Sequence, residues 1–306
     1  MSVKNCEKFI KDSIDSILKQ SFTNFEFLIV DNHSNDKSRS IINNYVEKDK
    51  RVKLLINNNN EKPSEGRVRA IKEVKNDWFA LMDADDISHP ERLEKQIKFI
   101  NSFNNINLGV LSTYGKYIDQ KNKVIGNMYV GPKNLEEFHN KFKNNNSYSI
   151  IDPSSVINKK AYIESGGYIN ENFAYDIDLF YKISEKGYII QTINEPLYYY
   201  RIHENSYSVK NTMEQRKITH YVNFNMRKRR KNENEISKDV FFKDHWKGYY
   251  KFLRNLNDLS MLYYKHAGYS FLQKKYLRFC FYIFFSFLIS PKYVFKKLYI
   301  TFLKKN

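Results

Sequence analysis

Two apolar runs in the first part of the chain each stop abruptly at polar residues. The run 27–30 ends at Asp31, and the run 79–82 ends at Asp83. Segments with apolar residues at helical spacing lie before and after these runs, and this alternation predicts a mostly parallel sheet with helices on both faces. Ligands of open α/β sheets bind outside the carboxyl ends of the strands, so we expect the binding site where the two runs end.

The same alternation predicts the residue ranges of the first helices and strands. We expect helices at 10–18, 38–46 and 67–74 and from residue 90, and strands at 25–30, 52–56 and 78–82. Asn5 is the expected N-cap of the first helix, because its side chain can accept hydrogen bonds from the free amides of a first turn. Residues 1–3 are short for a first strand, and we expect that part of this strand precedes Met1.

The charge and the cysteines narrow the possible partners and the compartment. The chain has 51 basic and 34 acidic residues, a formal net charge of +17, which favours anionic partners such as nucleotides, acidic lipid surfaces or nucleic acids. Cys6 and Cys280 lie far apart without a metal-ligand spacing, so we expect no disulfide framework. Residues 1–9 lack the apolar core of a signal peptide, and we expect a cytoplasmic protein.

Asp83 and Asp85 are alternate residues at the end of a predicted strand, so both carboxylates can turn toward one point in the following loop. Mg²⁺ and Mn²⁺ bind one or two protein carboxylates and complete their coordination with water and phosphate oxygens. The pair therefore predicts a divalent metal site that holds a diphosphate. The alternative is a helix N-terminus, in which Asp85 or Asp86 accepts hydrogen bonds from free amides.

Several motifs in order resemble those of family 2 of the inverting glycosyltransferases, which have the GT-A fold. The resemblance covers residues 1–209 and rests on the segments 1–5, 14–22, 25–34, 83–86, 172–180 and 200–208. It implies an enzyme of the EC 2.4 class that transfers a sugar from a nucleotide-sugar donor, expected to be a UDP-sugar, to an acceptor hydroxyl with inversion. It also implies Mn²⁺ or Mg²⁺ at Asp83 and Asp85, with Asp83 forming part of the donor site.

The resemblance implies further donor contacts from residues far apart in the sequence. Asp31 would lie against the base, Arg67 near the donor, and Arg201 and His203 against the diphosphate. Asn32 stands where the family usually has a second acidic residue, which leaves the identity of the base open. The alternatives are a turn-stabilising role for Asp31, an exposed helical position for Arg67, and structural roles for Arg201 and His203.

The segment 172–180 resembles the part of the family that carries the catalytic base. A neutral sugar hydroxyl is a poor nucleophile, so a carboxylate must take its proton as the new bond forms. Asp176 is the candidate implied by the resemblance, although Tyr175 stands where the family usually has Glu. Asp178 is the competing candidate, and its alternative role is that of a carboxylate in the first turn of a helix.

Gly166, Gly167 and Tyr168, together with the earlier segment 152–155, resemble the segments that shape the acceptor side of the pocket. Two successive glycines permit a backbone turn that a side chain would block. The alternative for Gly166 is a helix C-cap. The acceptor itself is left open among a glycan, a lipid-linked sugar and a protein.

Beyond residue 209 the composition shifts to Lys, Arg, Tyr and Phe at helical spacing, so we expect a catalytic domain at 1–209 and a helical region at 210–306. The run 279–289 is apolar apart from Ser286 and has Lys and Arg on both sides. A membrane-spanning helix takes about 20 apolar residues, so this run is too short to cross a bilayer. It either binds peripherally in the interface of an anionic membrane or packs onto the catalytic domain.

Three other functions compete with this interpretation. A family member that binds a nucleotide sugar without transferring it would also carry these motifs, and Asn32 and Tyr175 depart from the family pattern. A basic nucleic-acid-binding protein would explain the charge but not the carboxylates at two strand ends, which repel phosphates, so we expect no nucleic-acid partner. A nucleotidyltransferase should carry a Gly-rich loop near the N-terminus, which the sequence lacks.

Overall fold

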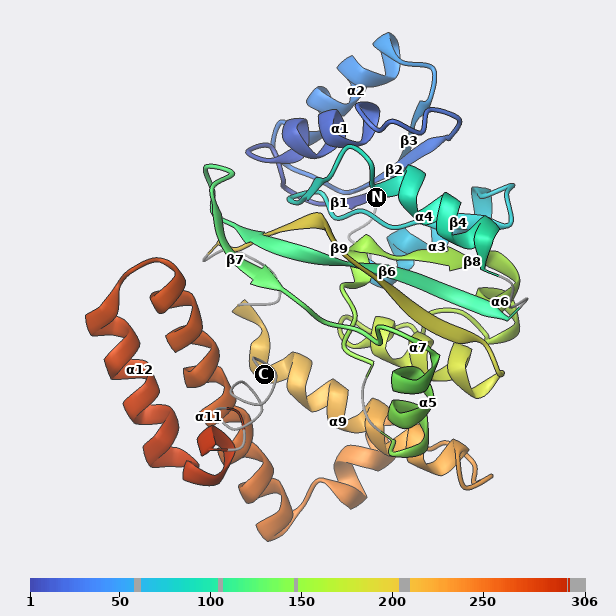
Figure 1. Cartoon of the computed structure of the whole chain (residues 1–306). Coiled ribbons are helices and arrows are strands. Elements are labelled where there is room, and N and C mark those ends of the chain that lie inside the picture. Colours follow the sequence, from blue (N-terminus) through green and yellow to red (C-terminus); the bar gives the residue numbers. More distant parts are fainter. Residues whose placement is uncertain (58–61, 104–106, 146–147, 204–209, 296, 298–306) are drawn as a thin grey trace. The chain divides into compact units, whose positions relative to one another are not determined.

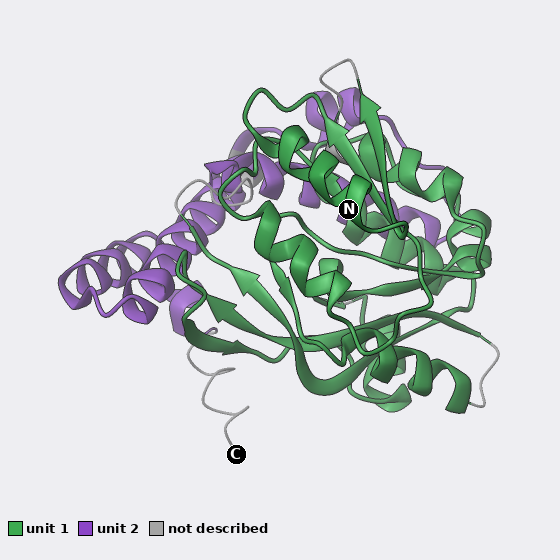
Figure 2. Cartoon of the chain, turned by 90° about the horizontal axis from the view of Figure 1, so that it is seen from above, with its two compact units in different colours: residues 1–203 green, residues 204–306 purple. Residues whose placement is uncertain are grey.

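The computed structural model describes residues 1–57, 62–103, 107–145, 148–203, 210–295 and 297, and the chain divides into two compact units (Figure 2). Unit 1 comprises Met1–His203, and unit 2 comprises Glu204–Asn306. The boundary expected after residue 209 adjoins residues 204–209, which lie outside the described residues, and it stays a prediction.

Unit 1 begins with a parallel sheet of three strands in the order β1-β2-β3 (Figure 1). Its elements along the chain are β1 (Ser2–Val3), α1 (Ile10–Leu18), β2 (Phe27–Asn32), α2 (Ser38–Lys48) and β3 (Val52–Asn57). Ile10, Ile14 and Ile17 recur at helical spacing and are buried in one core with Ile29 of the central strand. The alternating pattern predicted from the sequence is confirmed in this part of the chain.

The expected cap of the first helix is wrong. Phe9 is the N-cap residue of α1 and makes no side-chain capping hydrogen bond. Asn5 instead lies in the left-handed region, with φ of 52°, and its side-chain oxygen accepts a hydrogen bond from the backbone of Asn35 at 2.8 Å. Asn tolerates this conformation better than most residues do, and here it ties the loop after β1 to the loop after β2.

A second sheet of six strands is mixed, not parallel. Its strands in chain order are β4 (Trp78–Ala80), β5 (Ile87–Ser88), β6 (Leu108–Ile118), β7 (Val124–Met128), β8 (Val156–Asn158) and β9 (Ile189–Arg201). The long strands β6 and β9 pair in parallel, whereas β4 pairs with β8, β5 with β9, and β6 with both β7 and β8 in antiparallel fashion. An isolated parallel bridge between Ser2 and Asp83 links the segment after β4 to β1.

Helices cover both faces of the second sheet, as expected (Figure 1). The remaining helical elements of unit 1 are α3 (Pro63–Glu73), α4 (Arg92–Ser102), α5 (Leu135–Lys143), the 3₁₀ turn η1 (Asp152–Ser154), α6 (Lys159–Glu164) and α7 (Tyr175–Glu185). Helix α3 begins four residues before the expected start, because Pro63 suits a first turn and Glu65 accepts a hydrogen bond from the Lys62 backbone at 2.8 Å.

Unit 2 is helical, as its composition predicts. Its elements are α9 (Thr212–Arg229), α10 (Lys238–Val240), the π-helical turn η2 (Phe241–His245), α11 (Gly248–Leu272) and α12 (Tyr276–Ile289). Helices α11 and α12 pack against each other, and Ser260 and Ser286 exchange hydrogen bonds between them. Asp258 of α11 accepts hydrogen bonds from Arg216 and pairs with His220, both on α9. Across the described ranges of the chain, no helix is both long and apolar enough to cross a membrane.

Candidate functional site

Arg67 of α3 joins three segments of unit 1. Its Nη2 donates to Asp83 Oδ1 at 2.8 Å, and its Nη1 donates to Asp152 Oδ2. The guanidinium carbon also lies 5.4 Å from the centre of the Tyr175 ring. The segment after β4, the turn η1 and the first residue of α7 therefore meet at one arginine.

Close packing of α3 on the first sheet places Arg67 there. The preceding residue, Gly66, lies so near β1 that a Cβ atom would sit 2.8 Å from the Ser2 hydroxyl oxygen. Ser2 is in turn bridged to Asp83. A Cβ at position 66 would require the Ser2 hydroxyl to turn aside, and the next atoms, 3.6 Å and farther away, are at ordinary contact distance.

The two acidic strand ends lie at the same edge of the sheet, as expected. Val3 pairs with Asp31 on one side of β1, and Ser2 is bridged to Asp83 on the other side. Neighbouring strands are about 4.8 Å apart, so the backbones of Asp31 and Asp83 are separated by roughly 10 Å. This separation is of the order of the length of a nucleotide, although the Asp31 side chain itself is fully buried.

Opposing charges control the protonation of this cluster. Burial disfavours a charged Arg67, but the carboxylates of Asp152 and Asp83 outweigh burial and hold the pKa of Arg67 well above its ordinary value. Burial raises the pKa of Asp83 to about 6, with Arg67 opposing the rise and the nearby Asp85 carboxylate adding to it. The site therefore holds a permanent cation among carboxylates that compete for protons.

Asp176 lies in the first turn of α7, next to this cluster. The residue before the helix, Ala174, adopts a left-handed conformation with φ of 55° and turns the chain into α7. Burial raises the pKa of Asp176 to about 7, and the Asp152 carboxylate adds to the rise. A carboxyl group that changes its charge near pH 7 is suited to accept a proton during a reaction at that pH.

Asp178 has a different environment from Asp176. Its side chain is almost fully buried, and the ammonium group of Lys182 lies 2.8 Å from one of its oxygens. This i,i+4 ion pair occupies the carboxylate within the helix. The geometry therefore favours Asp176 over Asp178 as the candidate base.

His203, the last residue of unit 1, contacts Asp85. His203 Nε2 lies 3.1 Å from Asp85 Oδ2, and the His203 ring lies 5.1 Å from the Phe9 ring. The histidine follows β9 and the carboxylate follows β4, so strands far apart in sequence place this pair. His203 can thus orient the Asp85 carboxylate.

Arg201 is buried beside this pair and binds the backbone of the acidic segment. Its Nε donates to the Asp85 carbonyl at 2.5 Å, and its backbone amide donates to Asp86 Oδ1 at 2.7 Å. Its Nη1 donates to the Asp119 carbonyl and to the Asn122 side chain. Only about 1% of the residue is exposed, so these contacts hold the acidic loop in place.

Asp31 lies at the end of β2 with its side chain fully buried. Arg39 donates to Asp31 Oδ2 from Nε at 2.7 Å, and its Nη2 lies 2.7 Å from the same oxygen in an ion pair. The Ser34 amide donates to the other carboxylate oxygen at 3.3 Å. Asp31 thus stabilises the turn after β2. Arg39 and the Ser34 amide already orient the Asp31 carboxylate that the resemblance places against a nucleotide base.

The segment that follows α6 contains Gly166, Gly167 and Tyr168. It adjoins Arg67 through the rings of Tyr168 and Tyr175. The Gly166 amide donates to the Ile163 carbonyl and the Gly167 amide to the Tyr162 carbonyl, with Gly166 at φ of 81°. This is the Schellman arrangement, and it confirms the C-cap role of Gly166. The Tyr168 ring is buried, with its centre 5.2 Å from that of Tyr175.

Sequence reasoning missed the part played by Asp152. The segment 152–155 is expected on the acceptor side, which stays a prediction, and in addition Asp152 binds Arg67 and raises the pKa of Asp176. Pro153 is the only local signal, since it favours the tight turn that presents the carboxylate. The contact with Arg67 spans 85 positions, and no spacing rule reveals it.

The carboxylates of Asp83 and Asp85 fit a divalent metal that shares its coordination with a substrate. Their side chains are 37% and 29% exposed, so both can reach a ligand. Carboxylate oxygens are the ligands that Mg²⁺ and Mn²⁺ prefer. Within the described part of the chain, no group of three or more His, Cys, Asp or Glu residues is placed to hold a metal. Two carboxylates therefore suit a metal that completes its shell with water and phosphate.

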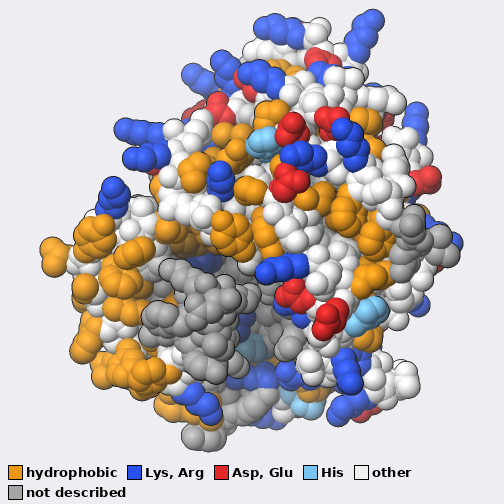
Figure 3. All heavy atoms as spheres, in the orientation of Figure 1, with side chains coloured by type: hydrophobic (Ala, Val, Ile, Leu, Met, Phe, Trp, Pro, Cys, Tyr) orange, Lys and Arg blue, Asp and Glu red, His pale blue; other side chains and the backbone are white. Residues whose placement is uncertain are grey.

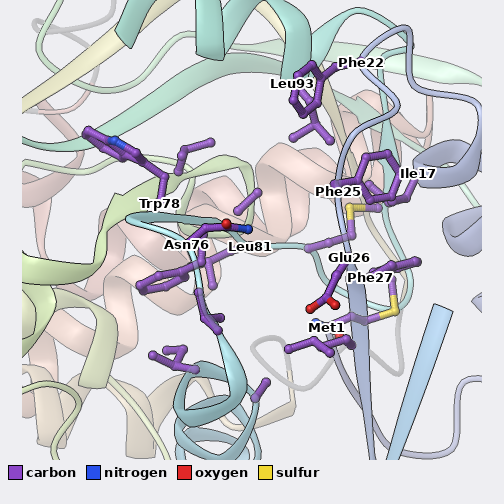
Figure 4. Close-up of a pocket in the computed structure, with 18 of the residues that line it drawn as sticks. Met1, Ile17, Phe22, Phe25, Glu26, Phe27, Asn76, Trp78, Leu81 and Leu93 are labelled. Atoms are coloured by element: carbon purple, nitrogen blue, oxygen red, sulfur yellow. Dashed lines mark hydrogen bonds between the residues drawn. The ribbon is translucent and has the colours of Figure 1, made fainter. Parts of the chain in front are cut away.

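A cavity of about 590 Å³ lies within unit 1, lined by residues of both sheets (Figure 4). Its lining includes Phe25 and Phe27, before and at the start of β2, and Trp78 and Leu81, at the start of β4 and just after it. The lining also includes Met82, which precedes Asp83, and Ser2, which is bridged to Asp83. Among the predicted site residues, only Arg67 contributes to the lining.

Comparisons of the sequence place the chain among known proteins. The sequence model described as Glycosyl transferase family 2 matches residues 1–166. The chain is 29% identical over 251 residues to an uncharacterized glycosyltransferase of Methanocaldococcus jannaschii, which covers 80% of this chain and 81% of that protein. It is 28% identical over 208 residues to the UDP-Glc:α-D-GlcNAc-diphosphoundecaprenol β-1,3-glucosyltransferase WfaP of Escherichia coli, covering 67% and 76% respectively. Three further relatives match over 31%, 36% and 45% of their own lengths.

Solved structures share the fold. Residues 1–349 of S. aureus TarS, in complex with UDP-GlcNAc, superpose with a TM-score of 0.58 at 16% identity, covering 92% of this chain and 87% of that one. The mannosyltransferase PcManGT from Pyrobaculum calidifontis, in complex with GDP-Man and Mn²⁺, superposes with a TM-score of 0.58 at 13% identity, covering 97% and 86%.

Proposed function

The chain belongs to glycosyl transferase family 2 and is a glycosyltransferase with the GT-A fold, and from this premise we propose that it transfers the sugar of a UDP-sugar to an acceptor hydroxyl with inversion. The observation that carries the proposal is the convergence of Asp83, Asp152 and Tyr175 on Arg67, with Asp176 beside them. This arrangement gathers a cation, candidate metal ligands and a candidate base at one edge of the sheet.

Asp176 is the proposed general base. With a pKa near 7, its carboxylate is ionised above neutral pH and takes the proton of the acceptor hydroxyl. The hydroxyl oxygen then forms a bond to the anomeric carbon as the bond from that carbon to the diphosphate oxygen breaks. The electron pair leaves with the nucleoside diphosphate, and a single displacement inverts the anomeric centre.

Asp83 and Asp85 would hold a divalent metal, Mn²⁺ or Mg²⁺, which when bound would neutralise negative charge on the diphosphate. The structure of PcManGT with GDP-Man and Mn²⁺ supports a metal in this fold. His203 orients the Asp85 carboxylate from 3.1 Å, and Arg67 orients that of Asp83 from 2.8 Å.

The donor site further includes Asp31, Arg67, Arg201 and His203. Asp31 lies at the strand end roughly 10 Å from Asp83, at the distance that separates a base from a diphosphate. Arg201 acts on the donor through the acidic loop that it holds, since most of its donor groups bind that loop and its neighbours. TarS with UDP-GlcNAc and the UDP-Glc-dependent enzyme WfaP support a uridine nucleotide.

We propose a lipid-linked sugar as the acceptor, approaching on the side of Gly166, Gly167 and Tyr168. The name of WfaP specifies a diphosphoundecaprenol-linked acceptor, which supports this class over a protein. Tyr168 contacts Tyr175, and Tyr175 contacts Arg67, so this side adjoins the reacting groups. An enzyme with such an acceptor would work at the cytoplasmic face of a membrane.

The test is release of nucleoside diphosphate from UDP-, GDP- and dTDP-sugars with Mn²⁺ or Mg²⁺, since slow hydrolysis reports a donor without an acceptor. We expect metal-dependent release from a UDP-sugar that is lost in Asp83→Asn/Asp85→Asn. Glu91→Gln/Glu195→Gln is the matched control, because both carboxylates are exposed and bind Lys95 away from the site. If the protein binds a nucleotide but neither releases nucleoside diphosphate from any donor nor transfers sugar to any acceptor, it is a non-catalytic binding protein. Absence of both binding and release would overturn the proposal.

A further inference from the structure

Helix α12 of unit 2 presents an apolar stripe to solvent. Leu277, Phe281, Phe284 and Leu288 are spaced by four, three and four residues and thus lie on one face of the helix. They are 90%, 54%, 59% and 63% exposed. We call these four residues the α12 stripe. Exposed Phe and Leu are ordinary one at a time, but a row of them marks a surface that binds something.

The stripe belongs to an ordered helix whose other face is well packed. Ser286 is fully buried and exchanges hydrogen bonds with Ser260 of α11. The ring of Tyr263 in α11 lies 6.1 Å from that of Tyr282 and 5.8 Å from that of Phe285. These contacts fix the rotation of α12, so the stripe points away from its own hairpin.

Further exposed aromatic residues extend the stripe into a patch. Figure 3 shows apolar side chains gathered over α12 and the neighbouring end of α11. The exposed residues around the stripe are Phe271, Tyr276, Phe287 and Phe295. All four are aromatic, and Phe and Leu are side chains that form the apolar face of helices lying in a membrane interface.

Basic residues surround this patch and acidic residues are almost missing from it. Residues 204–306 contain 22 Lys and Arg against 7 Asp and Glu, a net charge of +15 out of +17 for the chain. From Lys247 to the C-terminus, Asp258 is the only acidic residue, and it is buried against Arg216 and His220. Lys274, Lys275 and other exposed cations flank the α12 stripe.

We propose that the α12 stripe docks on the interface of an anionic lipid bilayer. The apolar side chains would enter the boundary between headgroups and acyl chains, and the cations would bind the acidic headgroups. At 14 residues α12 is roughly 21 Å long, so it lies along the surface and does not cross the bilayer. A second copy of the chain fits poorly, because the same cations would face each other.

This inference stands on unit 2 alone and does not depend on the proposed donor chemistry. Vesicle binding is measured without nucleotide, metal or acceptor. A failure of docking would therefore leave the transferase proposal in place, and a failure of transfer would leave docking in place.

The experiment is co-sedimentation of the full chain with phosphatidylcholine vesicles, with and without phosphatidylserine, at low and high salt. The test variant is Leu277→Ser/Phe281→Ser/Phe284→Ser, and the matched control is Val124→Ser/Tyr129→Ser/Ile163→Ser, which removes exposed apolar residues of unit 1. We expect the wild type and the control to bind the anionic vesicles and the test variant to bind at least about tenfold more weakly. Far-ultraviolet circular dichroism checks that the test variant keeps its helices.

A second pair of variants tests the electrostatic part. Lys274→Gln/Lys275→Gln/Arg278→Gln should lose about fivefold in binding for each cation removed near the surface. Lys48→Gln/Lys50→Gln/Lys143→Gln, at exposed positions of unit 1, should bind as the wild type does. Equal binding by the stripe variant and the wild type would overturn the proposal. So would self-association that the stripe variant abolishes while vesicle binding persists.

Discussion

Arg67 and Asp83 form a hydrogen-bonded ion pair, with Nη2 of the arginine 2.8 Å from Oδ1 of the aspartate. The other terminal nitrogen of the same guanidinium binds Asp152. The planar group thereby fixes the separation of two carboxylates that would otherwise repel each other. The distance between the candidate metal ligand and the turn that faces Asp176 is set by one side chain.

Replacing Arg67 by Lys should lower activity sharply although the charge is kept. A lysine ammonium is a point charge and cannot reach both carboxylates with the fork geometry of arginine. The loss of one charge-assisted hydrogen bond corresponds to roughly 1.5–3 kcal/mol, so we expect kcat/KM to fall at least about tenfold. Steady-state kinetics with saturating metal measures the effect.

Arg51→Lys is the matched control for this substitution. Like Arg67, Arg51 uses more than one nitrogen to bind carboxylate oxygens, in this case those of Asp49. It lies just before β3 and not among the candidate site residues. We expect Arg51→Lys to leave kcat/KM unchanged. An equal fall in both variants would show that the effect of Arg67 is one of stability and not of site geometry.

The pH profile should reflect the pKa of Asp176, which burial raises to about 7. A general base acts in its ionised form, so kcat/KM should rise with pH and level off above about 7. Asp176→Asn should lose roughly 10²–10⁴-fold in rate and should abolish this rise. Initial rates between pH 5 and 9 test the expectation.

Stability gives an independent readout for the same residue. The pKa of Asp176 is higher in the folded chain than in an unfolded one, where it is about 3.9, so the folded state binds the proton more tightly. Ionisation of Asp176 between about pH 4 and 7 therefore destabilises the fold. Asp176→Asn should unfold at higher denaturant than the wild type at pH 8, whereas Asp178→Asn, which loses its bond to Lys182, should unfold at lower denaturant. If Asp178→Asn were the more stable variant and Asp176→Asn the less stable one, Asp178 and not Asp176 would be the carboxylate with the raised pKa.

The sequence revealed the elements whose environment is local. Strand β2 was predictable because an apolar run buried on both faces is a strong signal, and α1 because Ile10, Ile14 and Ile17 recur at helical spacing. The placement of the two acidic segments near strand ends was also predictable, but the exact ends were not. Strand β2 continues through Asp31 to Asn32, and β4 ends at Ala80, two residues before the expected end.

The remaining features depend on contacts that no local pattern encodes. The three residues of β4 do not reveal that β8 will pair with them in antiparallel fashion. The resemblance implies a diphosphate contact for Arg201, with a structural role as the alternative, and no local pattern reveals its burial. Backbone carbonyls of two loops and the side chain of Asn122 accept its hydrogen bonds. Asp152 was overlooked because its partner lies 85 positions away.

His203→Ala should weaken metal binding by loosening Asp85. The imidazole holds the carboxylate from 3.1 Å, and loss of a group that orients a metal ligand costs roughly 10–100-fold in affinity. Titration of the full chain with Mn²⁺, followed by the signal of free Mn²⁺, measures this without turnover. His89→Ala is the control, since its ring stacks on Tyr199. Unchanged Mn²⁺ affinity in His203→Ala would show that the histidine serves the donor or the fold instead.

Asp258→Ala should destabilise unit 2 more than any surface substitution there. The carboxylate is buried and binds Arg216 Nε at 3.0 Å and His220 Nε2 at 2.8 Å, and removing it leaves two polar groups without their partner. Breaking a buried ion pair in this way costs about 3–5 kcal/mol.

These contacts also make the stability of unit 2 sensitive to acid. Burial opposes the charged form of Asp258, but the hydrogen bond with His220 and the charge of Arg216 prevail and lower its pKa. A depressed carboxyl pKa contributes stability above the ordinary value of about 3.9, and this contribution disappears as the pH falls through the folded value. The unfolding free energy of Asp258→Ala should therefore approach that of the wild type in strong acid. Asp244→Asn, at an exposed position, is the control and should change the unfolding free energy by less than about 0.5 kcal/mol. Urea unfolding at pH 7 and at pH 3 measures both differences, and a gap between Asp258→Ala and wild type that does not narrow at pH 3 would contradict the expected role of the ionised carboxylate.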